Sequence, residues 1–246
     1  MTPNRPRAAA SAVVSVLLAA MSTGLGAGSF QVNPVRIELR DGATSSAVIV
    51  RNGGTEPVVV QTSVLAWAQA DGKDVYAPTT EALATPPIAT IAPGGEQVLR
   101  VGLRRPPDPK RELAYRLYVQ EIPGTPQAGF QGLQVALRVG IPVFVTPLAT
   151  IARDFDWVAT RAPEGSVRLA VRNRGNVHLQ VYDFVLRGAT DGEFETREAQ
   201  IAYVLAGESR EWILRPAKPL PAAASMLRLT AHTDAGEINA SVRLDP

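Results

Sequence analysis

The chain has 246 residues, of which 46% are hydrophobic and 20% charged, with no cysteine and two histidines. This length corresponds to one or two domains, and the composition is that of a globular protein rather than a disordered or collagen-like one. The lack of cysteine excludes disulfide scaffolds, cysteine-ligated zinc and thiol catalysis, and two histidines leave little room for a histidine-rich metal site. We therefore expect no cofactor and no metal.

The net charge of +2 comes from the first residues of the chain. Residues 1–27 contain Arg5 and Arg7 and no acid, so without them the basic residues fall from 25 to 23 and equal the 23 acidic residues. Binding to nucleic acid depends on a clustered excess of basic charge. We therefore expect no nucleic-acid partner.

Residues 1–28 have the layout of a secretory signal peptide. A basic segment, Met1–Arg7, precedes the uncharged apolar stretch Ala8–Met21, and small residues follow it. The apolar stretch of about 14 residues is shorter than the ~20 needed to cross a bilayer. We expect an exported, periplasmic protein with no stable membrane insertion after the signal is removed, because export without cysteine suits a periplasm.

After Phe30 the sequence is typical of short strands. Turn signals recur about every ten residues, and apolar residues alternate with period two. In one such segment Leu99, Val101 and Leu103 would share a face. In another, Val167, Leu169 and Val171 would do so. The pattern predicts an all-β protein.

Two halves are expected in this β region. Residues 29–147 and 148–246 are each close to the ~100 residues of an immunoglobulin-like β-sandwich. No flexible linker separates them. We therefore expect two such domains at a fixed angle, in an L or boomerang shape.

One predicted strand is unusually long. Its apolar residues share one phase over thirteen positions, namely Leu133, Val135, Leu137, Val139, Ile141, Val143 and Val145. A usual strand has about 5–6 residues. Two interpretations are open: a core strand that bends into a second sheet, or a strand partly uncovered and offered to another chain. Pro142 lacks a ladder donor, which fits an edge strand or a bend better than the centre of a sheet.

Eight short motifs then carry a resemblance. In chain order they are Asn33-Pro34-Val35-Arg36-Ile37, Val50-Arg51-Asn52, Ala84-Thr85-Pro86-Pro87-Ile88, Ile91-Ala92-Pro93-Gly94, Arg111-Glu112 leading to Glu121-Ile122-Pro123, Leu133 to Pro147, Asn173-Arg174-Gly175-Asn176 and Val204-Leu205-Ala206-Gly207. Each motif alone is weak, but their order behind a signal peptide is specific. The sequence resembles the periplasmic chaperones of the chaperone–usher pilus pathway, in a divergent branch, over essentially the whole mature chain.

The resemblance implies a function for the long strand. Such chaperones hold pilus or fimbrial subunits folded by lending a strand to the subunit's open groove, and deliver them to an outer-membrane usher. By position, Leu133, Val135 and Leu137 correspond to the family's donor residues, and Val139 extends the row. The implied activity is donor-strand complementation, which is not enzymatic.

The resemblance also implies an anchor for the subunit's C-terminal carboxylate. Arg36 matches the first of the two basic residues that the family places between its domains. The position of the second, a lysine in the family, is Pro142 in this chain. The carboxylate site therefore has only one basic residue, or its second basic residue is another arginine. Arg138 and Arg116 are the two candidates.

A second departure concerns the interdomain brace of the family, in which an arginine bridges two acids. Glu112 and Asp234 match the acids, but Thr146 stands at the arginine position. Facing carboxylates repel, so one of them needs another partner or stays solvated.

Other functions find less support in the sequence. No Gly-x-Ser-x-Gly elbow, His-Glu-x-x-His segment or phosphate-binding loop with its lysine is present. His178 is interpreted as a strand or turn residue, and His232 lies near Asp234 without a nucleophile. The alternatives kept open are an exported pilus subunit and an adhesive β-sandwich module.

Overall fold

The computed structural model describes residues 30–124, 135–188, 194–216, 218 and 220–246. The expected signal peptide and Leu133 therefore lie outside the described residues. The described chain is strands and loops, apart from one short 3-10 helix, η1 (Pro163–Gly165). No helix in these ranges is long and apolar enough to cross a membrane. The expected all-β class is confirmed.

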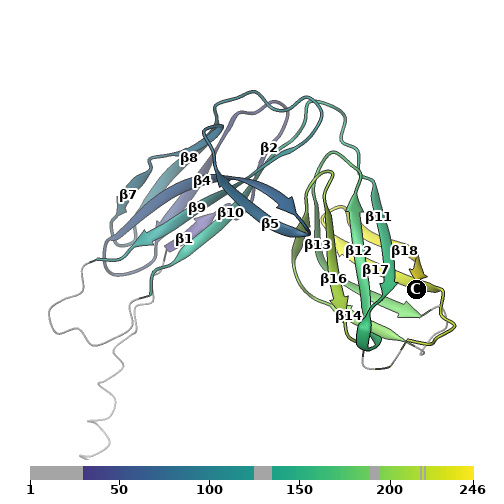
Figure 1. Cartoon of the computed structure of the whole chain (residues 1–246). Helices are drawn as coiled ribbons and strands as arrows, with labels where there is room; N and C mark the ends of the chain where they lie inside the picture. Colours follow the sequence, from purple (N-terminus) through teal and green to yellow (C-terminus); the bar gives the residue numbers. More distant parts are fainter. Residues whose placement is uncertain (1–29, 125–134, 189–193, 217, 219) are drawn as a thin grey trace, which may run out of the picture.

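The N-terminal domain consists of two facing sheets (Figure 1). The first has the order β1-β3-β8-β6, with the strands Phe30–Asn33, Ser45–Asn52, Glu96–Leu103 and Ala82–Thr85. The second has the order β2-β10-β9-β4-β5, with the strands Ile37–Leu39, Arg138–Val145, Leu113–Ile122, Val58–Ala70 and Lys73–Pro78, and β7 (Ile88–Ile91) also pairs with β4. Apolar side chains from both sheets, including Val48, Leu99 and Leu117, form one core between them.

The C-terminal domain is a sheet that curls around a second core. Its strands are β11 (Phe155–Arg161), β12 (Val167–Asn173), β13 (Leu179–Gly188), β14 (Glu195–Glu198), β15 (Ala202–Val204), β16 (Ser209–Leu214), β17 (Met226–Thr233) and β18 (Gly236–Asp245). The order is β14-β13-β17-β18-β11-β12-β16, with β15 paired to β13. A short parallel contact, with Ala159 opposite Leu244, joins β11 to β18 and so closes the two halves over the core.

The predicted alternation places side chains correctly in both domains. Leu99 and Val101 are buried in the first core, with Leu103 packed at its margin. Val167, Leu169 and Val171 are buried in the second core. The two domains make a bent molecule with the hairpin of β4 and β5 reaching the C-terminal domain (Figure 1), as the expected boomerang requires.

The segment between the domains is tied down by hydrogen bonds. Asn176 binds it three times: its backbone N–H donates to the Ala152 carbonyl at 3.0 Å, its side-chain amide donates to the Thr150 carbonyl at 3.0 Å, and its Oδ1 accepts from the Ala152 N–H at 2.8 Å. Only glycine fits at Gly175, because a Cβ there would lie 2.3 Å from the Ala152 carbonyl oxygen. These contacts hold the segment against the C-terminal domain.

The unusual strand is shorter than predicted. We expected thirteen residues from Leu133 to Val145, whereas β10 spans Arg138–Val145 and the described residues before it, Val135–Leu137, are not strand. The reason is pairing: apart from the Leu137 carbonyl, which accepts from the Glu121 N–H, the structure shows no ladder bond for this segment. The longest described strand is β4, with 13 residues.

Candidate functional site

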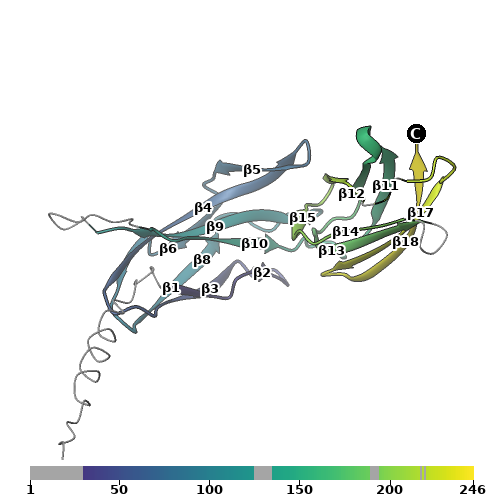
Figure 2. The ribbon, with the colours of Figure 1, turned by 90° about the horizontal axis from the view of Figure 1, so that it is seen from below.

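One edge of β10 is open along most of its length. On one side β10 pairs antiparallel with β9 from Arg138 to Val145. On the other side β2 pairs with it only at Val143–Val145. Figure 2 shows β10 running towards the C-terminal domain, with the short β2 beside that end. Within the described residues no strand covers the edge at 138–142, so this edge keeps main-chain groups for another strand.

The expected donor residues lie along this edge with graded exposure. Val139 and Leu137 are half-buried and pack against the margin of the N-terminal core, whereas Val135 is 61% exposed. Leu133, the first of the row, is outside the described residues. The three described side chains are thus close in sequence and space to the open edge.

Arg36 lies at the junction of the two domains, just before β2. Its Nη1 donates to Oε1 of Gln180 at 3.0 Å, and its Nη2 lies 3.1 Å from Oδ2 of Asp234 and 2.5 Å from Oε1 of Glu38. Gln180 and Asp234 belong to the C-terminal domain. The structure therefore adds a role that the sequence did not indicate, because Arg36 links the domains. Its Nε is buried and has no hydrogen-bond partner.

His178 is the partner that Glu112 and Asp234 lacked in the sequence analysis. Its Nδ1 lies 2.7 Å from Oε2 of Glu112 and its Nε2 lies 3.3 Å from Oδ2 of Asp234. Its backbone N–H also donates to the same Glu112 oxygen at 2.8 Å. The imidazole of His178 thus lies between the two acids and takes the role expected of an arginine. At the sequence position of that arginine this chain has Thr146. Thr146 instead donates to the Leu39 carbonyl.

Sequence reasoning did not place His178 at the domain junction. His178 was interpreted as a strand or turn residue, whereas it lies in neither, directly before β13, and that interpretation missed the ionic role. The available signal was a histidine between apolar Val177 and Leu179 at the start of a strand, in a chain that lacks its interdomain cation.

The charges of this cluster are mutually stabilising. Burial alone would lower the pKa of His178, but its hydrogen bonds to Asp234 and Glu112 outweigh burial and raise the pKa above its usual value. Burial would raise the pKa of Asp234, yet the bonds from His178 and the Gln180 backbone lower it. The His178–Asp234 pair therefore favours its ionised form.

A layer of aromatic side chains packs beside the ionic cluster. The imidazole of His178 stacks on Phe144 with ring centroids 3.6 Å apart and an interplanar angle of 12°. Phe144 also lies against Trp67 and Tyr203, at 5.7 Å and 5.5 Å between centroids. Phe144, on the opposite phase of β10 from the N-terminal core, is fully buried because the C-terminal domain covers it.

Gln69, near the end of β4, adds a direct link across the junction. Its Nε2 donates to the Tyr203 carbonyl at 2.8 Å, and its Oε1 accepts from the Leu205 N–H at 3.0 Å. Both partners are backbone groups of the C-terminal domain. The tip of the hairpin is thereby fixed to that domain.

The two further arginines considered for the clamp lie on one face of the second sheet. Arg116 is opposite Pro142 in the register, and its guanidinium lies 4.3 Å from the Trp67 ring centroid, with Nη2 donating to the Tyr76 hydroxyl at 3.1 Å. Arg138, further along, lies 3.9 Å over the ring of Tyr118. Arg116 is thus the one beside the position where the family lysine was expected.

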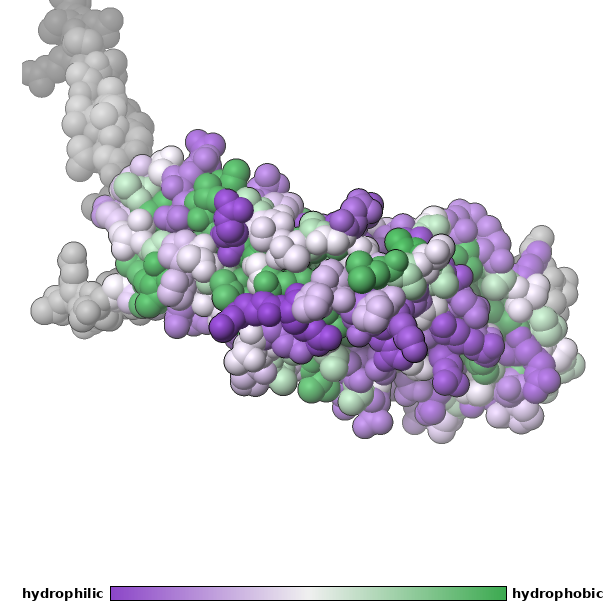
Figure 3. Space-filling view, turned by 90° about the horizontal axis from the view of Figure 1, so that it is seen from above, coloured by the Kyte–Doolittle hydropathy of each residue, from purple (hydrophilic) through white to green (hydrophobic). Residues whose placement is uncertain are grey.

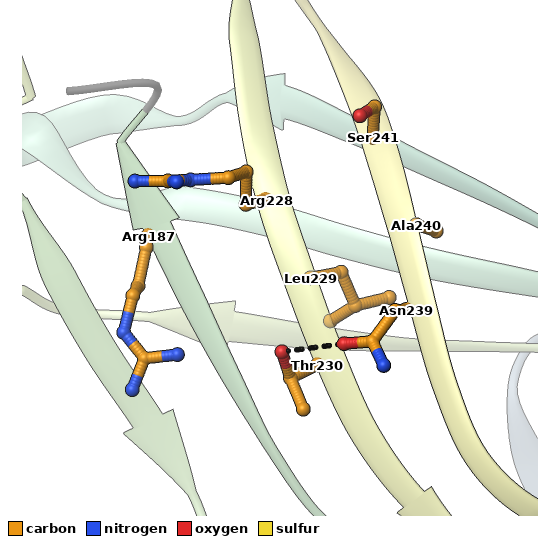
Figure 4. A pocket seen from close by; sticks show the side chains of 7 residues that line it. All are labelled: Arg187, Arg228, Leu229, Thr230, Asn239, Ala240 and Ser241. Carbon is orange, nitrogen blue, oxygen red and sulfur yellow. Dashed lines mark hydrogen bonds between the residues drawn. The ribbon is translucent and has the colours of Figure 1, made fainter. Parts of the chain in front are cut away.

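A hollow on the surface of the C-terminal domain is a weaker candidate for a binding site than the domain junction. Seven residues line it (Figure 4), namely Arg187, Arg228, Leu229, Thr230, Asn239, Ala240 and Ser241. Its polar groups are engaged within the domain: Arg187 pairs with Glu195 and Thr230 with Asn239. Across the described part of the chain no group of three or more His, Cys, Asp or Glu side chains is placed to hold a metal.

Hydrophilic and apolar residues are distributed unevenly over the surface. Figure 3 shows hydrophilic residues dominating the C-terminal part of one face, while apolar residues are scattered in small groups over its N-terminal part. His232, the second histidine, is exposed and pairs with Asp183 at 2.7 Å rather than with Asp234. The charged groups that meet in a buried cluster are therefore those at the domain junction.

Comparisons with known proteins agree with this geometry. Residues 29–150 match the family model of pili and flagellar-assembly chaperones, PapD N-terminal domain. The chaperone protein FimB/FhaD of Bordetella pertussis is 30% identical over 203 residues, covering 75% of this chain and 79% of that protein.

Solved chaperone structures share the fold. The structure of the CsuC–CsuE chaperone–tip adhesion subunit complex of Acinetobacter baumannii matches with a TM-score of 0.61 and 21% identity, over 88% of this chain and 98% of that one. The Escherichia coli chaperone DraB matches with a TM-score of 0.59 and 24% identity, over 88% and 97%.

Two β-sandwich domains joined by a fixed ionic and aromatic junction, with an internal strand edge left open, define a two-domain chaperone rather than a pilus subunit or an adhesive module. The chain belongs to the family of pili and flagellar-assembly chaperones.

Proposed function

We propose that the protein holds pilus or fimbrial subunits folded by lending them the edge of β10 and the segment before it. The single observation that carries this is the partial cover of β10, whose edge at 138–142 is unpaired in the described chain while the three residues after it are paired on both sides. Strand addition at such an edge forms main-chain hydrogen bonds that do not depend on sequence. The structure of the Salmonella enterica SafB chaperone in complex with the SafA pilin has the same fold. It matches with a TM-score of 0.61 and 18% identity, over 89% of this chain and 97% of that one.

Side chains of the donor row supply the remaining attraction. We assign Leu133, Val135, Leu137 and Val139 to the pockets of the subunit's groove. Each fully buried side chain of this kind contributes about 1.5–3 kcal/mol. Among the described residues of the row Val135 is the most exposed, so it is the first residue to test.

Arg36 is the proposed anchor for the subunit's C-terminal carboxylate. A guanidinium presents forked donors that match a carboxylate. Its side chain is only partly buried, with 26% of it exposed at the domain junction. We propose Arg116 as the second cation, since it lies opposite Pro142 on the neighbouring strand.

The setting of this activity follows from the family. We propose that residues 1–28 are an export signal, that residues 29–147 and 148–246 are the two domains, and that the protein acts in the periplasm and passes subunits to an outer-membrane usher. No catalytic step is part of this function, and neither a cofactor nor nucleic acid takes part.

Amide hydrogen exchange tests the strand addition directly. Binding of a subunit should slow exchange at Arg138 and Gly140, whose N–H groups alternate to the open-edge side of β10, and should leave Val139 and Ile141, which pair with β9, as slow as before. Unchanged exchange at both Arg138 and Gly140 in a purified complex would exclude this edge as the site.

A further inference from the structure

The two ring nitrogens of His178 face different demands. Nδ1 faces only an acceptor, Oε2 of Glu112 at 2.7 Å, and therefore carries a proton in either charge state. Nε2 lies 2.9 Å from Nη2 of Arg36 and 3.3 Å from Oδ2 of Asp234. An arginine can only donate and a carboxylate can only accept, so Nε2 cannot satisfy both at once.

Each charge state of the ring therefore selects one partner. Neutral His178 has a lone pair on Nε2, which accepts a hydrogen bond from Arg36. Protonated His178 has a hydrogen there, which it donates to Asp234. In that state Arg36 loses an acceptor and faces a second positive charge at 2.9 Å.

The imidazole itself is held in place. It stacks on Phe144 at 3.6 Å, its backbone N–H is bound to Glu112, and only 6% of its side chain is exposed. The Arg36 side chain is less constrained, because 26% of it is exposed at the mouth of the junction. A change of charge on the ring is therefore accommodated by the guanidinium rather than by rotation of the histidine.

Charged groups from every neighbouring element bear on this balance. Glu112 lies just before β9, Asp234 lies in the turn after β17, and Arg36 and Glu38 come from β2 and the residue before it. Tyr203 of β15 also faces the ring, with centroids 5.7 Å apart. The three acids outnumber the one arginine, which agrees with a pKa of His178 above its ordinary value.

We propose that His178 is a positioning residue whose charge state sets the partners of Arg36. When neutral it competes with Glu38 and Asp234 as an acceptor for the two Nη2 hydrogens, and when protonated it leaves those hydrogens to the two carboxylates and adds a positive charge that favours an incoming carboxylate. The last step rests on the proposed role of Arg36, whereas the coupling of the two side chains does not.

Nuclear magnetic resonance on the free protein tests the coupling. The chain has two histidines, so the ring signals of His178 and His232 can be separated with the variants His178→Gln and His232→Gln. Between pH 5.5 and 9 (about one unit below and more than two above an ordinary histidine pKa), the Arg36 Nε–H signal should shift with the same midpoint as His178. The shift should persist in His232→Gln and disappear in His178→Gln.

Two results would overturn the proposal: an Arg36 signal that does not move while His178 titrates, or a His178 ring that does not titrate in this range. The wild-type titration alone decides this if His178→Gln fails to fold. Sodium acetate, with acetamide as the neutral control, then separates the coupling from the proposed anchor. Acetate should perturb the Arg36 signal more strongly below the His178 midpoint than above it. If Arg36 follows His178 but acetate never perturbs it, the coupling stands and the anchor role fails.

Discussion

The two parts of β10 illustrate opposite uses of the same alternating pattern. Residues 143–145 pair with β9 and β2 and are fully buried on both faces. Residues 138–142 pair only with β9, and Val135 before them is exposed. The first part holds the domain together and meets the C-terminal domain, while the second keeps an edge for a partner.

This difference arises from the neighbours and not from the strand. Valine stands at 139 and at 143, and both side chains point to the N-terminal core. What changes is the length of β2, which has three residues and ends its pairing at Ile37. A short edge strand therefore divides β10 into a structural and an interacting part.

The largest expected effect is a loss of stability on substitution in residues 143–145 of β10. Val143→Asp buries a charge in the N-terminal core and should destabilise the protein by more than about 4 kcal/mol, or prevent folding. Val135→Asp, on an exposed residue of the same row, should change stability by less than about 0.5 kcal/mol. Urea unfolding followed by tryptophan fluorescence measures both, and equal losses would contradict the division of β10.

The next effect concerns the anchor beside β2. Arg36→Ala should weaken subunit binding about tenfold to a hundredfold, because a hydrogen bond to a charged group contributes about 1.5–3 kcal/mol. Arg40→Ala is the matched control, since Arg40 follows on the same segment and is exposed, with Glu38 as its partner. Titration of the purified subunit measures both, and an equal loss in Arg40→Ala would point to general electrostatics rather than an anchor.

A pH effect is expected at the junction that covers Phe144. The raised pKa of His178 means that the folded state binds the proton more tightly than the unfolded one. Its contribution is therefore complete below pH 6.5, the ordinary value, and is lost as pH rises through the raised pKa. Asp234 has a lowered pKa and therefore contributes stability that is complete above pH 3.8, its ordinary value. This contribution is lost as pH falls through the lowered pKa.

Urea unfolding at a series of pH values checks this prediction. The free energy of unfolding should decrease by about 1 kcal/mol as pH rises above 6.5, within the range of one hydrogen bond. His178→Gln should lack that decrease, whereas His232→Gln should change little because His232 is exposed. A decrease of the same size in His178→Gln would assign the pH dependence to another group.

The smallest effect distinguishes the two arginines beside the interacting part. Arg116→Ala should weaken subunit binding severalfold, and Arg138→Ala should leave it nearly unchanged, because only Arg116 faces Pro142. Neither should affect stability by more than about 1 kcal/mol, the size of a cation–π contact at an exposed site. The opposite ranking in a binding titration would make Arg138 the second cation.

The alternation of apolar residues was sufficient to predict the strands and the two cores. Strands such as β8 and β12 have one face buried, which imposes a period of two on the sequence. The length of the donor strand was not predictable in this way, because alternation from Leu133 onward specifies faces but not partners. The strand begins at Arg138, where its ladder with β9 ends opposite Gln120, and the alternation does not mark that position.

The ionic junction shows a similar limit. The absence of a cation at Thr146 was visible, and it predicted that one of Glu112 and Asp234 needs another partner or stays solvated; the structure shows both acids paired with His178. That partner, His178, comes from the second domain, 66 residues from Glu112. Contacts between domains leave no period in the sequence, so only the structure identifies them.

The central claim is that the exposed row before β10 captures subunits, and co-purification tests it most directly. The tagged protein would be co-expressed with a pilus subunit as wild type, Val135→Asp, Leu137→Asp and Val98→Asp. Val98 is a matched control, being an exposed valine on the other sheet of the same domain. We predict that the wild type and Val98→Asp retain a stoichiometric subunit, while the two row variants lose it and remain folded. A subunit recovered in full with Val135→Asp and Leu137→Asp would contradict the account.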